Sequence, residues 1–432
     1  MSDDVNELDV ENDDFEVGSV PEARVVAERF HRKLKPWHKP RKQLVRRAWR
    51  DNVSRLMSDL TWPLGAERVL RYFTLPAPEM LDIRTLVGPA REKQYKVQYV
   101  GFTDARNGSQ DDAQFRLAQN ALRVQDDWVH SDSNILYYKL EELAHGTRPV
   151  AKAKLKDYGP FHVVNFDLCD YLLAPGDNAK LLESLAHILD IQTSRQKDDW
   201  LLFIATRFDA ANTCPEKFAM LRQVIESNCA ESAEFQTGLE TLLKVAAGTF
   251  SQVLADPSAV NQEQLCAAIS VGLTKWLATV LAKAVPPFQL DMMKSYVYAV
   301  EGSTQDMLSF VYRCRYRGTA APANEAVIAA VGAKPNAAPL STVESTVGYT
   351  KQSTAAPAPA PSLEVEAALK AIKKTSGLLD LDKQLRDYPN ELISLGDETK
   401  ALLREANYSE EVLAEYDAWA RAEADKTEAP TS

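Results

Sequence analysis

The sequence predicts an α/β protein: a mostly parallel, doubly wound sheet with a terminal antiparallel hairpin, added helices and a small C-terminal helical bundle. Three observations predict this class. The middle of the chain alternates short apolar runs with helix-like segments, and such alternation implies crossover connections between parallel strands. Two later apolar runs flank a glycine-containing turn, which indicates a hairpin. A stretch rich in Ala and Pro then precedes a charged, helix-like C-terminal part.

Five segments have the composition of strands that are covered on both faces. Each is short, rich in β-branched or aromatic residues, and more nearly continuous than alternating in its apolar residues. In chain order they are 69–75 (VLRYFTL), 97–103 (VQYVGFT), 134–139 (NILYYK), 161–168 (FHVVNFDL) and 200–206 (WLLFIAT). The helix-like segments are 111–125, 178–189 and 215–229, followed by helical stretches near 232–253 and 262–285. The hairpin strands are 295–300 and 307–315.

The composition also divides the chain into parts. Its first residues are strongly acidic and offer little to bury, which predicts disorder. The expected parts are a disordered acidic tail at 1–24, a basic helical lead-in at 25–60, a sheet domain at 61–318 with a helical insertion at about 230–287, a linker at 319–362 and a helical bundle at 363–425. Within the bundle we expect roughly three short helices, divided near Pro389 and by a turn at Gly396 and Asp397.

Composition and motifs exclude several classes of protein. The net charge of -11 excludes a wholly basic nucleic-acid coat protein. The five cysteines are odd in number and widely spaced, which does not indicate a disulfide scaffold or a zinc ribbon. The six histidines show no metal-ligand spacing, so we expect no metal site. Lys275 and Lys283 interrupt the most apolar stretch, 266–285, so we expect a core helix, no membrane contact and a cytoplasmic protein.

The segment 31–50 (HRKLKPWHKPRKQLVRRAWR) is rich in Lys and Arg and contains no acidic residue. Such a density of cations suits contacts with phosphate groups, and its tryptophans could stack on bases. We therefore predict that this segment binds nucleic acid. The residues assigned to this role are Lys39, Arg41, Lys42, Arg46, Arg47 and Arg50. The alternative is a structural lead-in helix whose Trp37 and Trp49 dock on the sheet.

The strand schedule of residues 60–318 resembles that of class I S-adenosylmethionine-dependent methyltransferases, which have five parallel strands followed by a terminal hairpin. The stretch KPWHKPRKQLVRRAW also resembles a segment of divergent bacterial methyltransferase-like proteins, some of which are suspected to act in defence against phage. The resemblance implies a Rossmann-like methyltransferase fold, S-adenosylmethionine as the cofactor, and a transferase acting on or with nucleic acid, in antiviral defence as one context.

The resemblance also implies where the cofactor binds: at the carboxyl ends of the first two strands. The family usually has a glycine-rich turn after the first strand, but here the loop 75–82 (LPAPEMLD) contains no glycine. Its Asp82 would contact the ligand, or would simply be a first-turn carboxylate favoured by the helix dipole. Asp104 would accept hydrogen bonds from ribose hydroxyls, or would be held by turn amides. The cofactor-binding residues assigned in this way are Leu75, Pro76, Asp82, Gly101 and Asp104.

Polar residues near the end of the fourth strand are the catalytic candidates. Strand alternation places Asn165 and Asp167 on one face. The assigned residues are Asn165, Asp167 and Asp170, with an aspartate as general base and Asn165 orienting the nucleophile. The alternative is that they cap the next helix and satisfy loop amides. Cys169 is a nucleophile or, more simply, a small packing residue. The absence of an Asn-Pro-Pro-Tyr box argues against direct N-methylation of adenine or cytosine.

The C-terminal helices are the second region expected to bind a partner. Their charged surface and apolar positions would dock a protein partner or a second copy of the chain, or would pack back on the chain's own core. Two functions follow. One is a divergent S-adenosylmethionine-dependent methyltransferase-like protein that acts on or with nucleic acid. The other is a catalytically inactive scaffold of the same fold that binds nucleic acid and a protein partner.

Overall fold

A computed structural model of the chain describes residues 33–104, 111–144, 149–176, 180–300, 304–318 and 362–425. The expected acidic tail, the first residues of the basic lead-in, and the linker up to residue 361 lie outside the described residues.

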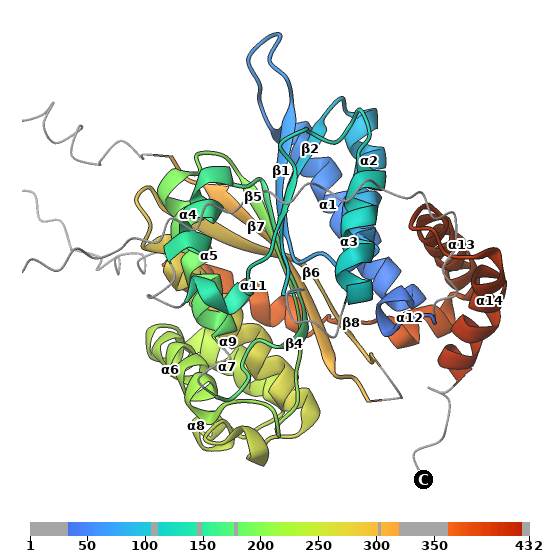
Figure 1. The fold of residues 1–432 in the computed structure, drawn as a ribbon. Helices are drawn as coiled ribbons and strands as arrows, with labels where there is room; N and C mark the ends of the chain where they lie inside the picture. The colour runs from blue at the N-terminus through green and yellow to red at the C-terminus, as the bar shows by residue number, and fades with distance from the viewer. Residues whose placement is uncertain are drawn as a thin grey trace, which may run out of the picture.

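The described part is built around one eight-stranded sheet (Figure 1). Its strand order is β3-β2-β1-β4-β5-β7-β6-β8. The first five strands are parallel, β7 runs antiparallel between β5 and β6, and the short β8 joins β6 in parallel. The strands are β1 (Val69–Thr74), β2 (Lys96–Phe102), β3 (Asn134–Leu136), β4 (Val163–Tyr171), β5 (Trp200–Arg207), β6 (Phe288–Tyr298), β7 (Met307–Tyr316) and β8 (Leu379–Asp380). A mostly parallel sheet with an antiparallel terminal hairpin is thereby confirmed.

The central strands are buried because their sequences are apolar on both faces. In β5 seven of the eight residues are buried, including Trp200 and Phe203. Helices therefore have to cover both faces of the sheet, and each face has its own apolar cluster. This arrangement confirms the predicted doubly wound architecture.

The helices divide between the two faces as the connections require. One face carries α1 (Pro40–Asp59), α2 (Leu81–Glu92) and α3 (Asp111–Val124). The other carries α4 (Pro149–Tyr158), α5 (Leu181–Arg195), α6 (Pro215–Glu231), α7 (Ala233–Leu243), α8 (Phe250–Val253), α9 (Gln262–Ala282) and α11 (Leu363–Thr375). The basic segment thus becomes η1 (Pro36–His38) and α1, and Trp49 of α1 stacks on Phe203 with ring centroids 5.4 Å apart.

Helix α9 is the one described helix that is long and apolar enough to cross a membrane by length and composition. Of its most apolar window, 78% is buried inside the protein. It packs between α6, α7 and α11, and its small Gly272 lies against Leu221 of α6. The expectation of a core helix is confirmed.

The C-terminal segment lies on both sides of the sheet (Figure 1). Helix α11 packs against α9 and β6, and β8 then pairs with the edge strand β6. After β8 the chain continues as α12 (Leu381–Asp387), α13 (Pro389–Glu405) and α14 (Glu410–Asp425). Helices α12 and α13 contact α1, and α14 packs outside them. These contacts are those of a segment that packs back on the chain's own core.

The predicted turn at Gly396 and Asp397 is wrong, because both residues lie inside α13. Gly396 faces α14, and a Cβ atom there would lie in ordinary van der Waals contact with Tyr416 Cε1, at 3.5 Å. Element ends also differ. The third strand is shorter than predicted, and β6 begins seven residues before the predicted 295 because it pairs with β7 along its whole length.

Candidate functional site

A cavity of about 490 Å³ lies at the carboxyl edge of the parallel strands, which we call the strand-tip pocket. It is lined by the residues that follow β1 and β2, by the end of β4, by the ends of β5 and β6, and by one side of η1 and α1. Ligands of open α/β sheets bind at this edge because the loops there diverge where the strand order reverses. Here the order reverses between β1 and β4, and both strands contribute to the pocket.

The pocket brings together most of the residues that the sequence analysis singled out. Nine of the assigned cofactor-binding, catalytic and nucleic-acid-binding residues line it: Leu75, Pro76, Asp82, Asp104, Asp167, Asp170, Arg41, Lys42 and Arg46. Asn165 and Gly101 lie beneath the lining rather than in it. Lys39 lies beside the end of β6, where its Nζ donates to the carbonyl oxygen of Val300 at 2.5 Å. Arg47 and Arg50 lie outside the pocket.

A buried hydrogen-bond network forms the floor beneath the pocket. Asp82 Oδ2 accepts from Thr74 Oγ1 at 2.5 Å and from Tyr72 Oη at 2.9 Å. Asn165 Nδ2 donates to Tyr72 Oη at 2.8 Å, while Asn165 Oδ1 has no hydrogen-bond partner. Burial, and then the nearby Asp82 carboxylate, raise the pKa of Tyr72 well above its usual value, so its hydroxyl remains a donor. Asn165 therefore acts on the pocket through Asp82, which lines it.

The loop after β1 packs against β2, because the ring of Pro76 lies directly on Gly101. A Cβ atom at Gly101 would lie 2.8 Å from Pro76 Cγ and 2.9 Å from Pro76 Cδ, so only glycine fits under this ring. One residue of this loop adopts the left-handed backbone conformation that glycine usually provides. That residue is Met80, with φ 52°. A side chain there costs about 1 to 2 kcal/mol. The glycine-free loop is therefore held in place by packing.

Glu79, which the sequence analysis did not single out, anchors this loop. Its side chain is fully buried and accepts hydrogen bonds from Trp37 Nε1 at 3.2 Å, Arg116 Nη1 at 3.3 Å and Tyr408 Oη at 3.0 Å. Burial alone would raise the pKa of Glu79, but the interactions with His38, Trp37 and Tyr408 lower it to about 2. A charged residue next to a Pro-Ala-Pro sequence was the only signal in the sequence. The partners of Glu79 come from three distant segments, so local patterns do not reveal them.

Two of the cations of α1 are satisfied inside the protein. Lys42 Nζ pairs with Asp167 Oδ1, and it also lies 5.0 Å from the Trp49 ring centroid. Burial would lower the pKa of Lys42, but the Asp167 carboxylate outweighs it and raises this pKa, so Lys42 stays charged. Arg41 Nη1 donates to the carbonyl oxygen of Ala299. These side chains attach α1 to the ends of β4 and β6.

Arg46 differs from its neighbours on α1. Only 4% of its surface is exposed, yet its Nε and Nη1 have no hydrogen-bond partner. The hydroxyl of Tyr298, which is 2% exposed and lines the same side of the pocket, lies near Lys42 and donates to no acceptor. Buried polar groups are almost always hydrogen-bonded, and an unpaired buried charge is costly. This end of the pocket therefore holds donors without an acceptor.

The predicted nucleic-acid surface is not exposed as expected. Lys39, Arg41, Lys42 and Arg46 are each at most 5% exposed, so they cannot form a continuous face for a phosphate backbone. Arg47 pairs with Glu398 of α13 at 2.7 Å, and Arg50 pairs with the adjacent Asp51 at 3.2 Å. The sequence pattern could not show this, because basic residues that face inward look the same as basic residues that face solvent.

The acidic residues at the rim are more accessible. Asp104 follows β2 and pairs with Lys139 at 3.1 Å, with its side chain 53% exposed. Asp170 is exposed, and its Oδ1 accepts a hydrogen bond from the backbone N–H of Tyr171. The pairing of β4 with β5 is irregular between Asp167 and Tyr171, so the simple alternation assumed for this strand stops there. Cys169 also lines the pocket.

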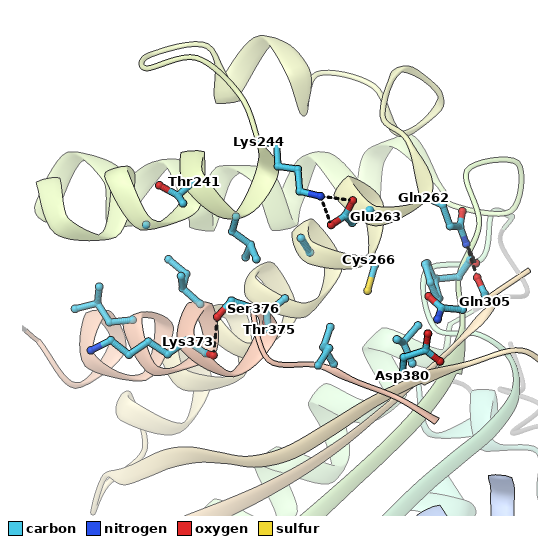
Figure 2. A pocket seen from close by; sticks show the side chains of 18 of the residues that line it. Thr241, Lys244, Gln262, Glu263, Cys266, Gln305, Lys373, Thr375, Ser376 and Asp380 are labelled. Atoms are coloured by element: carbon cyan, nitrogen blue, oxygen red, sulfur yellow. Dashed lines mark hydrogen bonds and ion pairs between the residues drawn. The ribbon is translucent and has the colours of Figure 1, made fainter. Parts of the chain in front are cut away.

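A second cavity, of about 940 Å³, lies between α7, α9 and α11; we call it the helical pocket (Figure 2). Lys244 Nζ pairs with Glu263 Oε1 there at 2.7 Å, and Gln262 Nε2 donates to the carbonyl oxygen of Gln305 at 2.8 Å. Burial raises the pKa of the Cys266 thiol to about 12, which makes it a poor nucleophile. None of the site residues assigned from the sequence lines this cavity. The described residues include no group of His, Cys, Asp and Glu that could hold a metal ion.

Comparison with known proteins places the chain in a family without giving it an activity. A search of the curated proteins finds no match. A family model described as PP_RS20740-like matches residues 31–421, which include the whole sheet, α1 and the C-terminal helices up to α14. The match extends over far more than half of the 432 residues, and the chain is therefore a member of the PP_RS20740-like family.

Proposed function

We propose that this protein is a divergent S-adenosylmethionine-dependent methyltransferase-like protein that binds its cofactor in the strand-tip pocket. The observation that carries the proposal is the convergence of the residues assigned to cofactor and catalysis on one cavity at the carboxyl edge of β1, β2 and β4. A sheet of five parallel strands ending in an antiparallel hairpin supports it, since that schedule was the basis of the resemblance.

The residues present fit such a cofactor in two respects. A volume of about 490 Å³ is within the usual range for a small-molecule site. Asp104 stands after β2 with about half of its side chain exposed, so its carboxylate can accept hydrogen bonds from two hydroxyls. Leu75, Pro76 and Asp82 would form the neighbouring wall. S-adenosylmethionine, when bound, would supply an electrophilic methyl group.

The chain's own residues suggest a division of roles near that cofactor. Asp170 is the exposed carboxylate of the three catalytic candidates, and we assign it the role of proton acceptor. Asp167 holds Lys42 and so fixes the position of α1 over the pocket. Asn165 positions Asp82 through Tyr72. Asn165 and Asp167 are positioning residues in this proposal.

Action on or with nucleic acid stays a prediction. If the segment 31–50 binds nucleic acid, its phosphate contacts have to come from other cations than Lys39, Arg41, Lys42 and Arg46, which are buried. The described candidates are Lys33, Lys35, Arg47 and Arg50.

A specific observation favours the second function, a catalytically inactive scaffold. The Pro76 ring rests on Gly101 without room for a Cβ atom, so the loop after β1 lies closer to β2 than the resemblance leads us to expect. Such packing would restrict the approach of a cofactor to the backbone of this loop.

Isothermal titration of the full chain with S-adenosylmethionine and S-adenosylhomocysteine separates the two functions. The methyltransferase-like function predicts saturable heat and a rise in melting temperature with at least one of them. It also predicts that Asp104→Asn weakens this binding, because an amide accepts fewer hydrogen bonds than a carboxylate. No heat and no thermal shift at saturating cofactor would leave only the scaffold.

A further inference from the structure

The strand order gives the strand-tip pocket two different ends. The β2 and β3 end holds Phe102, Asp104 and Lys139, and it is the end to which the proposed function assigns the cofactor. The opposite end lies over β5, β7 and β6, where Arg207, Tyr298 and Met307 line it together with α1. A ligand that fills one end leaves the other free for a second group.

The second end is rich in donors and short of acceptors. Arg46 has two buried guanidinium nitrogens without a hydrogen-bond partner, and the buried Tyr298 hydroxyl, which lies near Lys42, has no acceptor. These two side chains come from α1 and β6, so the fold converges two unsatisfied donors on one cavity wall. Their coincidence is not explained by packing, because a methionine or phenylalanine would fill the same space without the desolvation cost.

The nearby carboxylates are already engaged. Asp167 pairs with Lys42, and Glu79 accepts from Trp37, Arg116 and Tyr408. Within the described residues no carboxylate lies within ion-pair distance of Arg46. The described residues therefore offer Arg46 no anionic partner.

We propose that Arg46 and Tyr298 form an oxyanion site, which binds a phosphate or carboxylate group of a small second ligand of the strand-tip pocket. The planar guanidinium group presents its donors to two oxygens of such a group at once, and the tyrosine hydroxyl donates to it as well. That this second ligand is the methyl acceptor rests on the proposed function; the oxyanion site itself does not.

The burial of Arg46 sets the size of the ligand. A side chain that is 4% exposed at the wall of a cavity is reached by a small molecule that enters the cavity. A nucleic-acid duplex carries its phosphates on a wide, stiff rod and contacts exposed cations. The site therefore fits a small phosphorylated or carboxylated molecule.

The test measures melting temperature and binding heat of the full chain with inorganic phosphate and with acetate, at constant ionic strength set with chloride. We expect a saturable response of the natural sequence to at least one anion, and the stronger response identifies phosphate or carboxylate as the group. Arg46→Met should lower the affinity for that anion about tenfold or more. Arg46→Lys should recover part of this affinity, because it keeps the positive charge but lacks the planar guanidinium group.

Two controls separate recognition from a structural role. Arg55→Met, an exposed position on the same helix, should leave the response unchanged. Without anion, Arg46→Met should melt at or above the temperature of the natural sequence, because it removes an unpaired buried charge. An Arg46→Met variant that is less stable and still responds to the anion would overturn the proposal.

A parallel titration with S-adenosylmethionine distinguishes failure of this inference from failure of the proposed function. The Arg46→Met variant and the natural sequence should have the same affinity for S-adenosylmethionine. Loss of cofactor binding with an unchanged anion response would place Arg46 at the cofactor and overturn the inference. A natural sequence that responds to neither anion, or that binds only a single-stranded oligonucleotide through Arg46, would overturn it as well.

Discussion

The larger of the two cavities is the less informative one. The helical pocket has about twice the volume of the strand-tip pocket, 940 against 490 Å³. Its charged pair, Lys244 and Glu263, is exposed and neutralises itself. Its Thr375 hydroxyl is buried without a partner, but that is a neutral group. The strand-tip pocket instead contains the buried, unpaired guanidinium group of Arg46.

The difference teaches that unsatisfied buried charge, rather than volume, indicates a ligand. Desolvating a charge costs much more free energy than desolvating a hydroxyl. An unpaired buried charge therefore either binds a ligand or destabilises the fold. It also predicts that substitutions around the strand-tip pocket have large effects, while a matched substitution in the helical pocket has a small one.

The largest effect is expected for Glu79→Gln, which removes the charge that anchors the wall of the strand-tip pocket. The pKa of Glu79 is about 2 in the folded state, against 4.5 as the ordinary value. Because it is lowered, its contribution is present above pH 4.5 and is lost as the pH falls toward 2. We expect the variant to lose about 3 kcal/mol at neutral pH.

Urea unfolding of both proteins between about pH 7 and about pH 3 measures this effect. The stability gap should narrow below pH 4.5, by about 1.4 kcal/mol per pH unit at most. A gap that is small at neutral pH, or that does not change with pH, would contradict an ionised anchoring role for Glu79.

A smaller effect is expected for Gly101→Ala. The new methyl group would collide with the Pro76 ring at 2.8 Å, and the loop after β1 would have to move. Overpacking of this kind costs about 1 to 3 kcal/mol. The matched control is Gly88→Ala in α2, where no heavy atom lies within 4 Å of the new Cβ atom. That control should raise stability by up to about 1 kcal/mol, since alanine is the better helix former. Equal changes in the free energy of unfolding for the two substitutions would contradict close packing of Pro76 on Gly101.

The smallest effect is expected for Glu263→Ala in the helical pocket. The Lys244–Glu263 pair is about two-thirds exposed on both sides, so solvent screens it. Its removal should change the free energy of unfolding by less than about 1 kcal/mol. A loss as large as that of Glu79→Gln would show that the two cavities do not differ in the way proposed.

The five parallel strands β1 to β5 were predictable to within a few residues because a strand buried on both faces must be apolar almost throughout, as 200–206 is. Positions near the strand ends were predictable for a related reason: the carboxyl ends of parallel strands meet at one edge, which brought Asp82, Asp104 and Asp167 to one cavity. Asn165 was correctly placed near them, but its side chain lies under the pocket floor.

Other features depended on contacts between distant segments. Glu79 is surrounded by donors from η1, α3 and the α13–α14 connection, and Tyr408 reaches it across 329 positions of sequence. Gly396 and Asp397 resemble a turn in sequence, yet both lie inside α13, which packs against α14. Local propensity carries no information about such partners.

By itself, the sequence determined the α/β class, the order of the strands along the chain, the hairpin, and the edge of the sheet at which polar residues gather. Those properties follow from local patterns of burial, whose period is set by the backbone geometry of strands and helices. Only the tertiary structure decided that four cations of this segment, Lys39, Arg41, Lys42 and Arg46, turn inward. The first three have partners in Val300, Ala299 and Asp167, whereas the Nε and Nη1 of Arg46 have none. The direction of a charged side chain depends on which surface its helix covers, and that surface is assembled from segments far apart in the chain.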